Sequence, residues 1–412
     1  MRRILRLLGW IFALPFSIAC IAALGVLIFL FSLKLKFEEL IRSGVPDGPG
    51  PSICSDGKSM EDISKRLSSI PFKPVKPQAI GFLKGALANN VFLILNAARA
   101  TAGMMYPYPD NFEEVVIESF DGTPITATVG LHKDGKKRPG LVISHGFMGS
   151  KNDHYIVDTA ISAFAGWGFN VVCVDLRNFG GSQRLSHSPT TAGWKEAEDL
   201  LAAAKYLSEQ PDVTSVGITG FSMGAGSTMR AAYAARVYPY LTGGALAWNG
   251  YADTRRMVEY ISTRPQVSDP FYPIHLVFRL MHKIRREDMK RYITDPEILS
   301  YLDKGFDEAS FVDYVEKIAA PHYGVTVDEI YANSSPKEFL AEVSVPLLIV
   351  HAEDDPICPP SEMEELKSVE EENPFVKIWM LPSGNHCMFR YLDRKWYEEV
   401  SRSFFEYWAR WE

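Results

Sequence analysis

The 412-residue sequence is short of cysteines and of clustered basic residues, and each shortage excludes a class of protein. Its five cysteines do not make a disulfide framework, because Cys20 lies in an apolar N-terminal segment and Cys173 in a run typical of a buried strand. No spacing of cysteine and histidine suggests a metal site, so neither a metal nor another cofactor is expected. The formal net charge is −7 and no basic block is present, which argues against nucleic acid as a partner.

The longest apolar run covers residues 7–33, which contain no charged side chain and are flanked by arginines on one side and lysines on the other. The run is long enough to span a bilayer. A cleaved signal peptide has a shorter apolar core, and the run continues well beyond Cys20, which argues against a lipoprotein cleavage site there. Residues 1–36 are therefore predicted to be a single-pass membrane anchor. The flanking charges nearly balance, so the side of the membrane stays open.

Residues 37–111 are predicted to form a linker and an N-terminal helical region. Proline-rich breaks fall at residues 45–51 and 71–77. The stretch at residues 81–100 is mainly apolar but includes Lys84 and Arg99. A helix that packs on the domain or lies at the membrane surface is therefore favoured over a second span.

From Phe112 onward, short apolar runs alternate with helical patterns, which predicts an α/β fold with a mostly parallel sheet flanked by helices. The blocks at residues 112–250 and 344–412 form the core. Between them, residues 251–343 are rich in tyrosine, phenylalanine, methionine and arginine and are a candidate helical cap insertion. Eight strands are predicted, at residues 115–118, 125–131, 141–144, 169–175, 213–219, 245–248, 345–350 and 375–381.

Residues 220–224 read Gly-Phe-Ser-Met-Gly and lie between a predicted strand and a predicted helix. In this setting the pattern G-x-S-x-G indicates a nucleophile elbow, in which a serine occupies a strained backbone conformation at a sharp turn. The positions two before and two after the serine cannot carry side chains, and Gly220 and Gly224 meet that demand. The alternative is an ordinary glycine-rich turn. The context favours Ser222 as a nucleophile.

Two later loops supply an acid and a base in the chain order nucleophile, acid, histidine. The sequence His-Ala-Glu-Asp-Asp-Pro follows a predicted strand, and Asp355 is the preferred acid, with Asp354 and Glu353 as alternatives. His386 ends a turn-rich loop after the last predicted strand and is the expected general base. An imidazole can take the serine proton near neutral pH, and a buried carboxylate holds the ring tautomer.

Acyl transfer also requires backbone donors for the oxyanion. Met223 follows the nucleophile and Phe147 lies in the loop after the strand at residues 141–144, so these two residues are the predicted donors. His145 either shapes this loop through hydrogen bonds or is a plain turn residue. No catalytic role is expected for the histidines in loop-like or cap-region sequence, His132, His187, His275 and His282.

From about Phe112 to the C-terminus, these motifs resemble those of the α/β hydrolase superfamily. More narrowly, the chain resembles the membrane-anchored abhydrolase-domain group, which includes esterases, monoacylglycerol-type lipases and phospholipases. Asn178 and Ala225 stand where many relatives have glycine. The acyltransferase signature His-x4-Asp of some relatives does not begin at His145, His351 or His386. The resemblance rests on residues 144–147, 175–177, 180–182, 193, 196–199, 220–224, 331–335, 351–356 and 385–386.

The sequence thus predicts an anchored serine hydrolase that cleaves carboxylic esters through an acyl-enzyme. A lipid or another membrane-partitioning ester is the favoured substrate. A peptidase, an acyltransferase or a cofactor-free peroxidase on the same fold stays open, as does a non-catalytic binding module. Cys358 and Cys387 follow the acid and the histidine on loops that must converge, and we hypothesise that they lie close together and could bond in an oxidising compartment.

Overall fold

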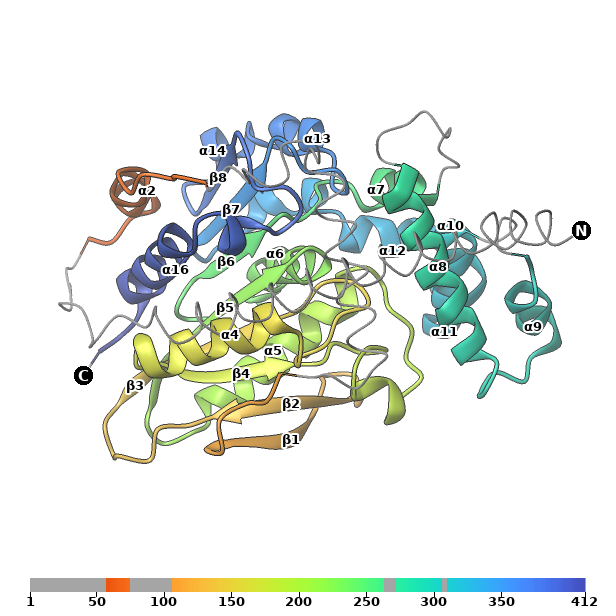
Figure 1. The fold of residues 1–412 in the computed structure, drawn as a ribbon, viewed down its shortest axis with the longest axis horizontal. Helices are drawn as coiled ribbons and strands as arrows, with labels where there is room; N and C mark the ends of the chain where they lie inside the picture. The colour runs from red at the N-terminus through yellow and green to blue at the C-terminus, as the bar shows by residue number, and fades with distance from the viewer. Residues whose placement is uncertain (1–56, 75–105, 263–271, 306–309, 412) are drawn as a thin grey trace, which may run out of the picture. The chain divides into compact units, whose positions relative to one another are not determined.

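The structure is a computed structural model that describes residues 57–74, 106–262, 272–305 and 310–411 (Figure 1). The expected anchor at residues 7–33 and the apolar stretch at residues 81–100 lie outside this part of the chain. Among the helices of the described ranges, none is both long enough and apolar enough to cross a membrane. The anchor therefore stays a prediction.

An eight-stranded sheet has the strand order β1-β2-β4-β3-β5-β6-β7-β8. β1 pairs antiparallel with β2, β2 pairs antiparallel with β4, and the remaining pairs are parallel. The prediction of eight strands in a mostly parallel sheet is confirmed, although several ends shift by a few residues. The strands are β1 (Phe112–Glu118), β2 (Pro124–Gly130), β3 (Arg138–Ser144), β4 (Asn170–Val174), β5 (Val213–Phe221), β6 (Ala245–Trp248), β7 (Leu347–Ala352) and β8 (Val376–Leu381).

Helices cover both faces of the sheet, which explains why the central strands are continuous apolar runs rather than alternating ones (Figure 1). One hydrophobic cluster joins the sheet to α5 (Trp194–Ser208), α6 (Met223–Ala234), α13 (Pro360–Leu366) and α14 (Val369–Glu372). A second cluster joins the other face to α2 (Met60–Ser68), α4 (His154–Ile161), α15 (Phe389–Leu392) and α16 (Arg394–Trp408).

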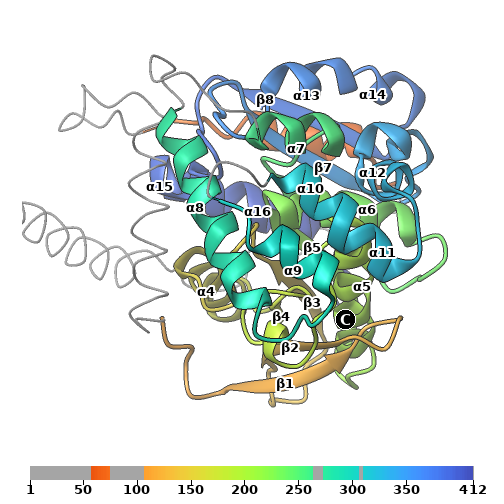
Figure 2. The same ribbon diagram turned by 90° about the vertical axis from the view of Figure 1, so that its right-hand side faces the viewer.

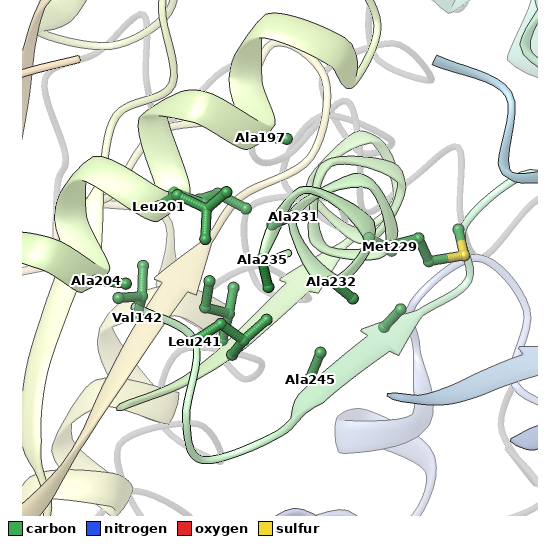
Figure 3. Close-up of a cluster of buried hydrophobic side chains, with 14 of the residues drawn as sticks. Val142, Ala197, Leu201, Ala204, Met229, Ala231, Ala232, Ala235, Leu241 and Ala245 are labelled. Carbon is green, nitrogen blue, oxygen red and sulfur yellow. The ribbon is translucent and has the colours of Figure 1, made fainter. Parts of the chain in front are cut away.

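Alanines let α5 and α6 approach each other and the sheet closely (Figure 3). Strand β3 is equally tight, because a Cβ on Gly140 would lie 2.5 Å from Cδ2 of Leu207 in α5. Larger side chains at such positions would overpack the core at a cost of about 1–3 kcal/mol each. This packing fixes α6, whose first residue directly follows Ser222. The buried alanines labelled in Figure 3 are Ala197, Ala204, Ala231, Ala232, Ala235 and Ala245.

A buried ion-pair network holds the loop after β4. The fully buried Arg177 lies 2.6 Å from Asp199 and 2.6 Å from Asp121. Burial alone would lower the pKa of this guanidinium, but Asp199 keeps it above its ordinary value. The next residue, Asn178, has a φ of 67°. Asparagine tolerates this left-handed region better than most residues, so Asn178 fits the turn.

A separate group of helices is inserted between β6 and β7 and gathers at one end of the sheet (Figures 1 and 2). These helices share their own hydrophobic cluster, which includes Met257, Tyr301 and Phe311. They fall within residues 251–343, the range expected to form a cap, and we refer to them as the cap. They are α7 (Thr254–Ser262), α8 (Tyr272–Met289), α9 (Pro296–Leu302), α10 (Phe311–Tyr314), α11 (Ala320–Tyr323) and α12 (Val327–Ser334).

Candidate active site

Ser222 lies at the sharp turn between β5 and α6. Its backbone has a φ of 57° and a ψ of −118°, a combination that is unfavourable for a residue with a side chain. A Cβ on Gly220 would lie 2.1 Å from the carbonyl oxygen of Gly224, and a Cβ on Gly224 would lie 2.4 Å from that of His145. The two glycines therefore permit a turn that no other residue type would fit, as a nucleophile elbow requires.

The structure brings Ser222, His386 and Asp355 together. Ser222 Oγ lies 2.8 Å from His386 Nε2. The other ring nitrogen, Nδ1, lies 3.0 and 3.1 Å from the two carboxylate oxygens of Asp355. In the neutral ring, Nδ1–H donates to Asp355, and Nε2 can accept a hydrogen bond from the serine hydroxyl. The three residues come from the loops after β5, β7 and β8.

Asp355 is buried with an exposed fraction of 6% and is surrounded by hydrogen-bond donors. The backbone N–H groups of Ile357 and Cys358 donate to its Oδ1 at 2.8 and 3.0 Å. Burial alone would raise the pKa of Asp355, but the attraction of the His386 ring and the hydrogen bond from it hold the pKa below its ordinary value. The carboxylate is therefore ionised at neutral pH, as a group that orients an imidazole must be.

The neighbouring carboxylates have other surroundings. Oδ1 of Asp354 accepts the backbone N–H groups of Gly384 and Asn385 at 2.9 and 2.7 Å. Asp354 thus ties the loop that carries His386 to the loop that carries Asp355. Glu353 is exposed. Of the three carboxylates weighed from the sequence, Asp355 is the one placed at the imidazole.

Asn249 is a member of the site that sequence reasoning missed. It directly follows β6, is fully buried and has a φ of 49°. Its Nδ2 donates to Asp355 Oδ2 at 2.7 Å and to the carbonyl oxygen of Asn385 at 2.9 Å. One amide group therefore binds the acid and the loop of the base together. The available signal was weak: an asparagine before a glycine at the end of a buried strand, where a positive φ is common.

His145 shapes the loop after β3. Its ring is buried, Nε2 accepts the backbone N–H of Leu176 at 3.1 Å, and Nδ1 lies 2.7 Å from the carbonyl oxygen of Gly146. These contacts place the ring proton on Nδ1. Burial lowers the pKa of His145, which keeps the ring neutral. The hydrogen-bonding role suggested by the sequence is confirmed.

The two predicted oxyanion donors lie beside Ser222. Phe147 and Met223 both line the cavity that contains Ser222. Gly146 packs directly on the elbow, since a Cβ there would lie 3.1 Å from Ser222 Cβ. Met223 is the first residue of α6, so its N–H belongs to the group at a helix start that has no partner within the helix. Donation by Phe147 and Met223 to an oxyanion stays a prediction.

An apolar cavity lies over Ser222, with one wall from the core and one from the cap. The rings of Phe147 and Phe311 meet across it with centroids 5.3 Å apart. The cavity has a volume of about 70 Å³. The core wall includes Phe147, Phe179 and Met223, and the cap wall includes Met257, Val258, Ile261, Phe311, Tyr314 and Val315.

Two polar residues of α8 also reach the cavity wall. Arg285 donates to the carbonyl oxygen of Asn178 and to Oε1 of Gln183, both at 2.6 Å, and so ties the cap to the loop after β4. His282 Nε2 lies 3.0 Å from the hydroxyl of Tyr301. Burial lowers the pKa of His282 to about 4, so this ring is neutral at pH 7 and compatible with an apolar ligand.

Cys358 and Cys387 are free thiols. Cys358 lines the cavity, and Cys387 Sγ lies 3.5 Å from the carbonyl oxygen of Trp248. Burial raises the pKa of both thiols above the ordinary value. They are therefore protonated at neutral pH, and the disulfide that the sequence left open is not formed in this structure.

A family model described as the alpha/beta hydrolase family matches residues 141–399. The match covers more than half of the chain and runs from β3 into α16, so the chain belongs to this family. Membership confirms the superfamily inferred from the motifs. The narrower membrane-anchored group stays a prediction.

Individual relatives are distant. An abhydrolase domain-containing protein of Dictyostelium discoideum is 24% identical over 257 residues, which span 60% of this chain and 62% of that protein. The match thus covers less than two thirds of that relative. A Synechocystis protein, whose name gives it provisionally as an esterase, is 23% identical over 269 residues that span 60% of this chain and 69% of that protein. The structure of a Pyrococcus furiosus esterase matches with a TM-score of 0.47 and 16% identity, over 73% of this chain and 93% of that one.

Proposed function

We propose that this protein is a serine hydrolase that cleaves carboxylic esters through an acyl-enzyme. The observation that carries the proposal is the continuous hydrogen-bonded line from Ser222 Oγ to His386 Nε2, at 2.8 Å, and from His386 Nδ1 to Asp355, at 3.0 Å. A serine hydroxyl becomes an effective nucleophile when an adjacent base accepts its proton and a third group orients that base. Membership of a hydrolase family supports the same reading.

The reaction takes place in two halves. First, Ser222 Oγ attacks the ester carbonyl carbon while its proton passes to His386 Nε2. The tetrahedral intermediate collapses, the bond to the leaving oxygen breaks, and Nε2 gives its proton to the departing alcohol. Second, a water loses a proton to Nε2 and attacks the acyl carbon. Ser222 then leaves with that proton and the acid is released. Asp355 stays ionised throughout and stabilises the imidazolium.

The oxyanion of each intermediate would be held by the backbone N–H groups of Phe147 and Met223. Two arguments support these donors. Both residues line the cavity at Ser222, and the N–H of Met223 lies at the positive end of the α6 dipole. Such preorganised donors commonly contribute about 3 kcal/mol each to transition-state stabilisation.

The cavity supports an ester with an apolar acyl group as the substrate. The side chains on both walls are mainly apolar, so they suit an acyl chain better than a polar group. A lipid or another membrane-partitioning ester fits this chemistry, and the expected anchor at residues 1–36 would hold the domain where such esters concentrate. We therefore propose a membrane location, with the substrate and the bilayer as partners and with no metal or cofactor in the reaction.

The test is hydrolysis of p-nitrophenyl esters from acetyl to palmitoyl by the detergent-solubilised full chain and its Ser222→Ala variant. Ser227→Ala is the matched control, because Ser227 lies further along α6, is buried and donates to the carbonyl oxygen of Met223. We expect Ser222→Ala to lose at least about 10⁴-fold in kcat, while Ser227→Ala stays active. The acyl chain length that gives the highest rate would separate a short-chain esterase from a lipase.

Two results would contradict the proposal. Equal rates of the wild type and Ser222→Ala would show that the reaction does not use this serine. If neither protein hydrolyses any ester of the series, ester cleavage is excluded, and peptide or acyl-transfer substrates become the next to test.

A further inference from the structure

Three potential metal ligands converge behind the catalytic serine. A carboxylate oxygen of Asp355, Sγ of Cys358 and a ring nitrogen of His386 all lie within 4.8 Å of one another. The carboxylate and the thiol come from the loop after β7, and the imidazole comes from the loop after β8. The sequence predicted that these two loops converge, but it did not indicate that Cys358 joins Asp355 and His386 as a third potential ligand.

We infer that these three residues form a site for a thiophilic divalent cation such as Zn²⁺, and that filling the site stops the hydrolase. The inhibitory part rests on the proposed function. Zn²⁺ accepts one thiolate, one imidazole and one carboxylate in a tetrahedral arrangement and leaves a fourth position for water. A thiolate and a carboxylate carry two negative charges, which match the charge of the cation in a buried site.

The geometry is already close to the one required. With bonds of about 2.0 Å to nitrogen and oxygen and about 2.3 Å to sulfur, the ligand atoms of a tetrahedral site lie roughly 3.3–3.5 Å apart. His386 Nδ1 lies 3.0 and 3.1 Å from the oxygens of Asp355. Cys358 Sγ lies within 4.8 Å of the other two ligand atoms, and rotation about its Cα–Cβ bond would move it. Its backbone is fixed, because its N–H donates to Asp355 and its carbonyl oxygen lies 3.1 Å from His351 Nε2.

The cation would occupy the place of the proton between His386 and Asp355. When Nδ1 binds the metal, the ring proton that Nδ1 donated to Asp355 moves to Nε2, so the imidazole stays neutral with one proton. That nitrogen would then donate to Ser222 Oγ instead of accepting its proton, and the general base would be lost. The thiol of Cys358 releases one proton to solvent when its sulfur binds, the ring keeps its own proton, and no electron is transferred.

A route to the site is present. Cys358 lines the same cavity as Ser222, and the side chain of His386 is 11% exposed. An ion that enters by the substrate path would thus meet the thiol and the imidazole. The inhibitor and the substrate would use one entrance, so a bound acyl-enzyme should slow the arrival of the cation.

Binding can be tested without any activity. Ser222→Ala protein would be titrated with Cd²⁺ and Co²⁺, and the thiolate-to-metal charge-transfer absorbance would be recorded. We expect one equivalent of metal per chain, loss of the band when Cys358→Ser is added, and retention of the band when Cys387→Ser is added instead. Cys387 is the matched control because it is a free thiol next to His386 and lies outside the ligand set. Cys358→Val, which keeps an apolar side chain of similar size, is the second variant if Cys358→Ser does not fold.

Inhibition is then measured by Zn²⁺ titration of the full active chain, with each variant referred to its own metal-free rate. The concentration that halves the rate should rise at least about tenfold in Cys358→Ser and stay unchanged in Cys387→Ser. Equal inhibition of wild type and Cys358→Ser, or absence of the thiolate band, would overturn the inference. A thiolate band in a protein that hydrolyses no ester would support the metal site and contradict the ester proposal, so the two failures are distinguishable.

Discussion

Replacement of Asn249 by glycine tests whether the site depends on one buried amide. The side chain donates two hydrogen bonds, at 2.7 Å to Asp355 and at 2.9 Å to the carbonyl oxygen of Asn385. Glycine removes both bonds but adopts the φ of 49° without strain. Asn249→Ala would remove the same bonds and add roughly 1–2 kcal/mol of backbone strain, so glycine isolates the effect of the side chain.

The expected loss can be estimated from the partners. A hydrogen bond to a charged group contributes about 1.5–3 kcal/mol and a neutral one about 0.5–1.5 kcal/mol. Asn249→Gly should therefore lower the free energy of unfolding by about 2–4 kcal/mol. Because the amide connects the loops of the acid and the base, we also expect kcat to fall roughly 10- to 100-fold through misplacement of His386. KM should change little, since Asn249 is absent from the cavity lining.

Steady-state hydrolysis and urea unfolding would be measured on the same preparations. Asn333→Ala is the matched control: Asn333 also makes two hydrogen bonds, to Arg230 and to the carbonyl oxygen of Glu329, but it lies on α12. The control should lose stability without losing kcat. If Asn249→Gly loses stability and keeps the wild-type kcat, the amide supports only the fold, and the reasoning about the acid and base loops is refuted.

Three further predictions follow from burial, tight packing and cap attachment. Burial raises the pKa of Glu362 to about 7, so its contribution to stability is complete below about pH 4.3 and is lost as pH rises through 7. In urea unfolding, Glu362→Gln should have the same free energy of unfolding as the wild type at pH 4 and a value about 1–3 kcal/mol higher at pH 8. An equal difference at both pH values would contradict this. Gly220→Ala would place a Cβ 2.1 Å from the carbonyl oxygen of Gly224, so we expect thermal unfolding to show a loss of more than about 3 kcal/mol in the free energy of unfolding. A stable and fully active variant would exclude the elbow geometry. Arg285→Met would remove both 2.6 Å hydrogen bonds from α8 to the core, so the rates measured over the p-nitrophenyl ester series should extend towards longer acyl chains. Unchanged rates over the series would show that these bonds do not close the cavity.

The sheet and the order of the site residues were predictable because both depend on local patterns. Strands β3 to β7 are short apolar runs, and Ser222, Asp355 and His386 each follow such a run. Strand ends were less accurate: β5 extends to Phe221, two residues beyond the prediction, because the elbow itself continues the strand. Helix α6 likewise begins at Met223, within the G-x-S-x-G pattern.

Long-range contacts were not predictable in the same way. Asn249 reaches Asp355 and Asn385 only because β6 lies beside β7 in the sheet, and no local pattern gives that contact. The choice between Asp354 and Asp355 had the same difficulty, since both lie in the turn after β7, where neighbouring side chains point in different directions. The structure shows one carboxylate at the ring and the other at the backbone of the loop. The grouping of Cys358 with His386 also depends on how two loops meet.

The two sides of the cavity differ in how well they tolerate amino-acid substitutions. The residues expected to make and break bonds follow β5, β7 and β8, where a change in backbone would disturb the sheet. Met257, Val258 and Ile261 of the opposite wall belong to α7, outside the sheet. A substitution there changes the shape offered to an acyl group and costs no more than an ordinary core replacement, about 1–3 kcal/mol. Descendants of this chain could therefore acquire new substrate preferences one residue at a time while the reaction centre is inherited unaltered.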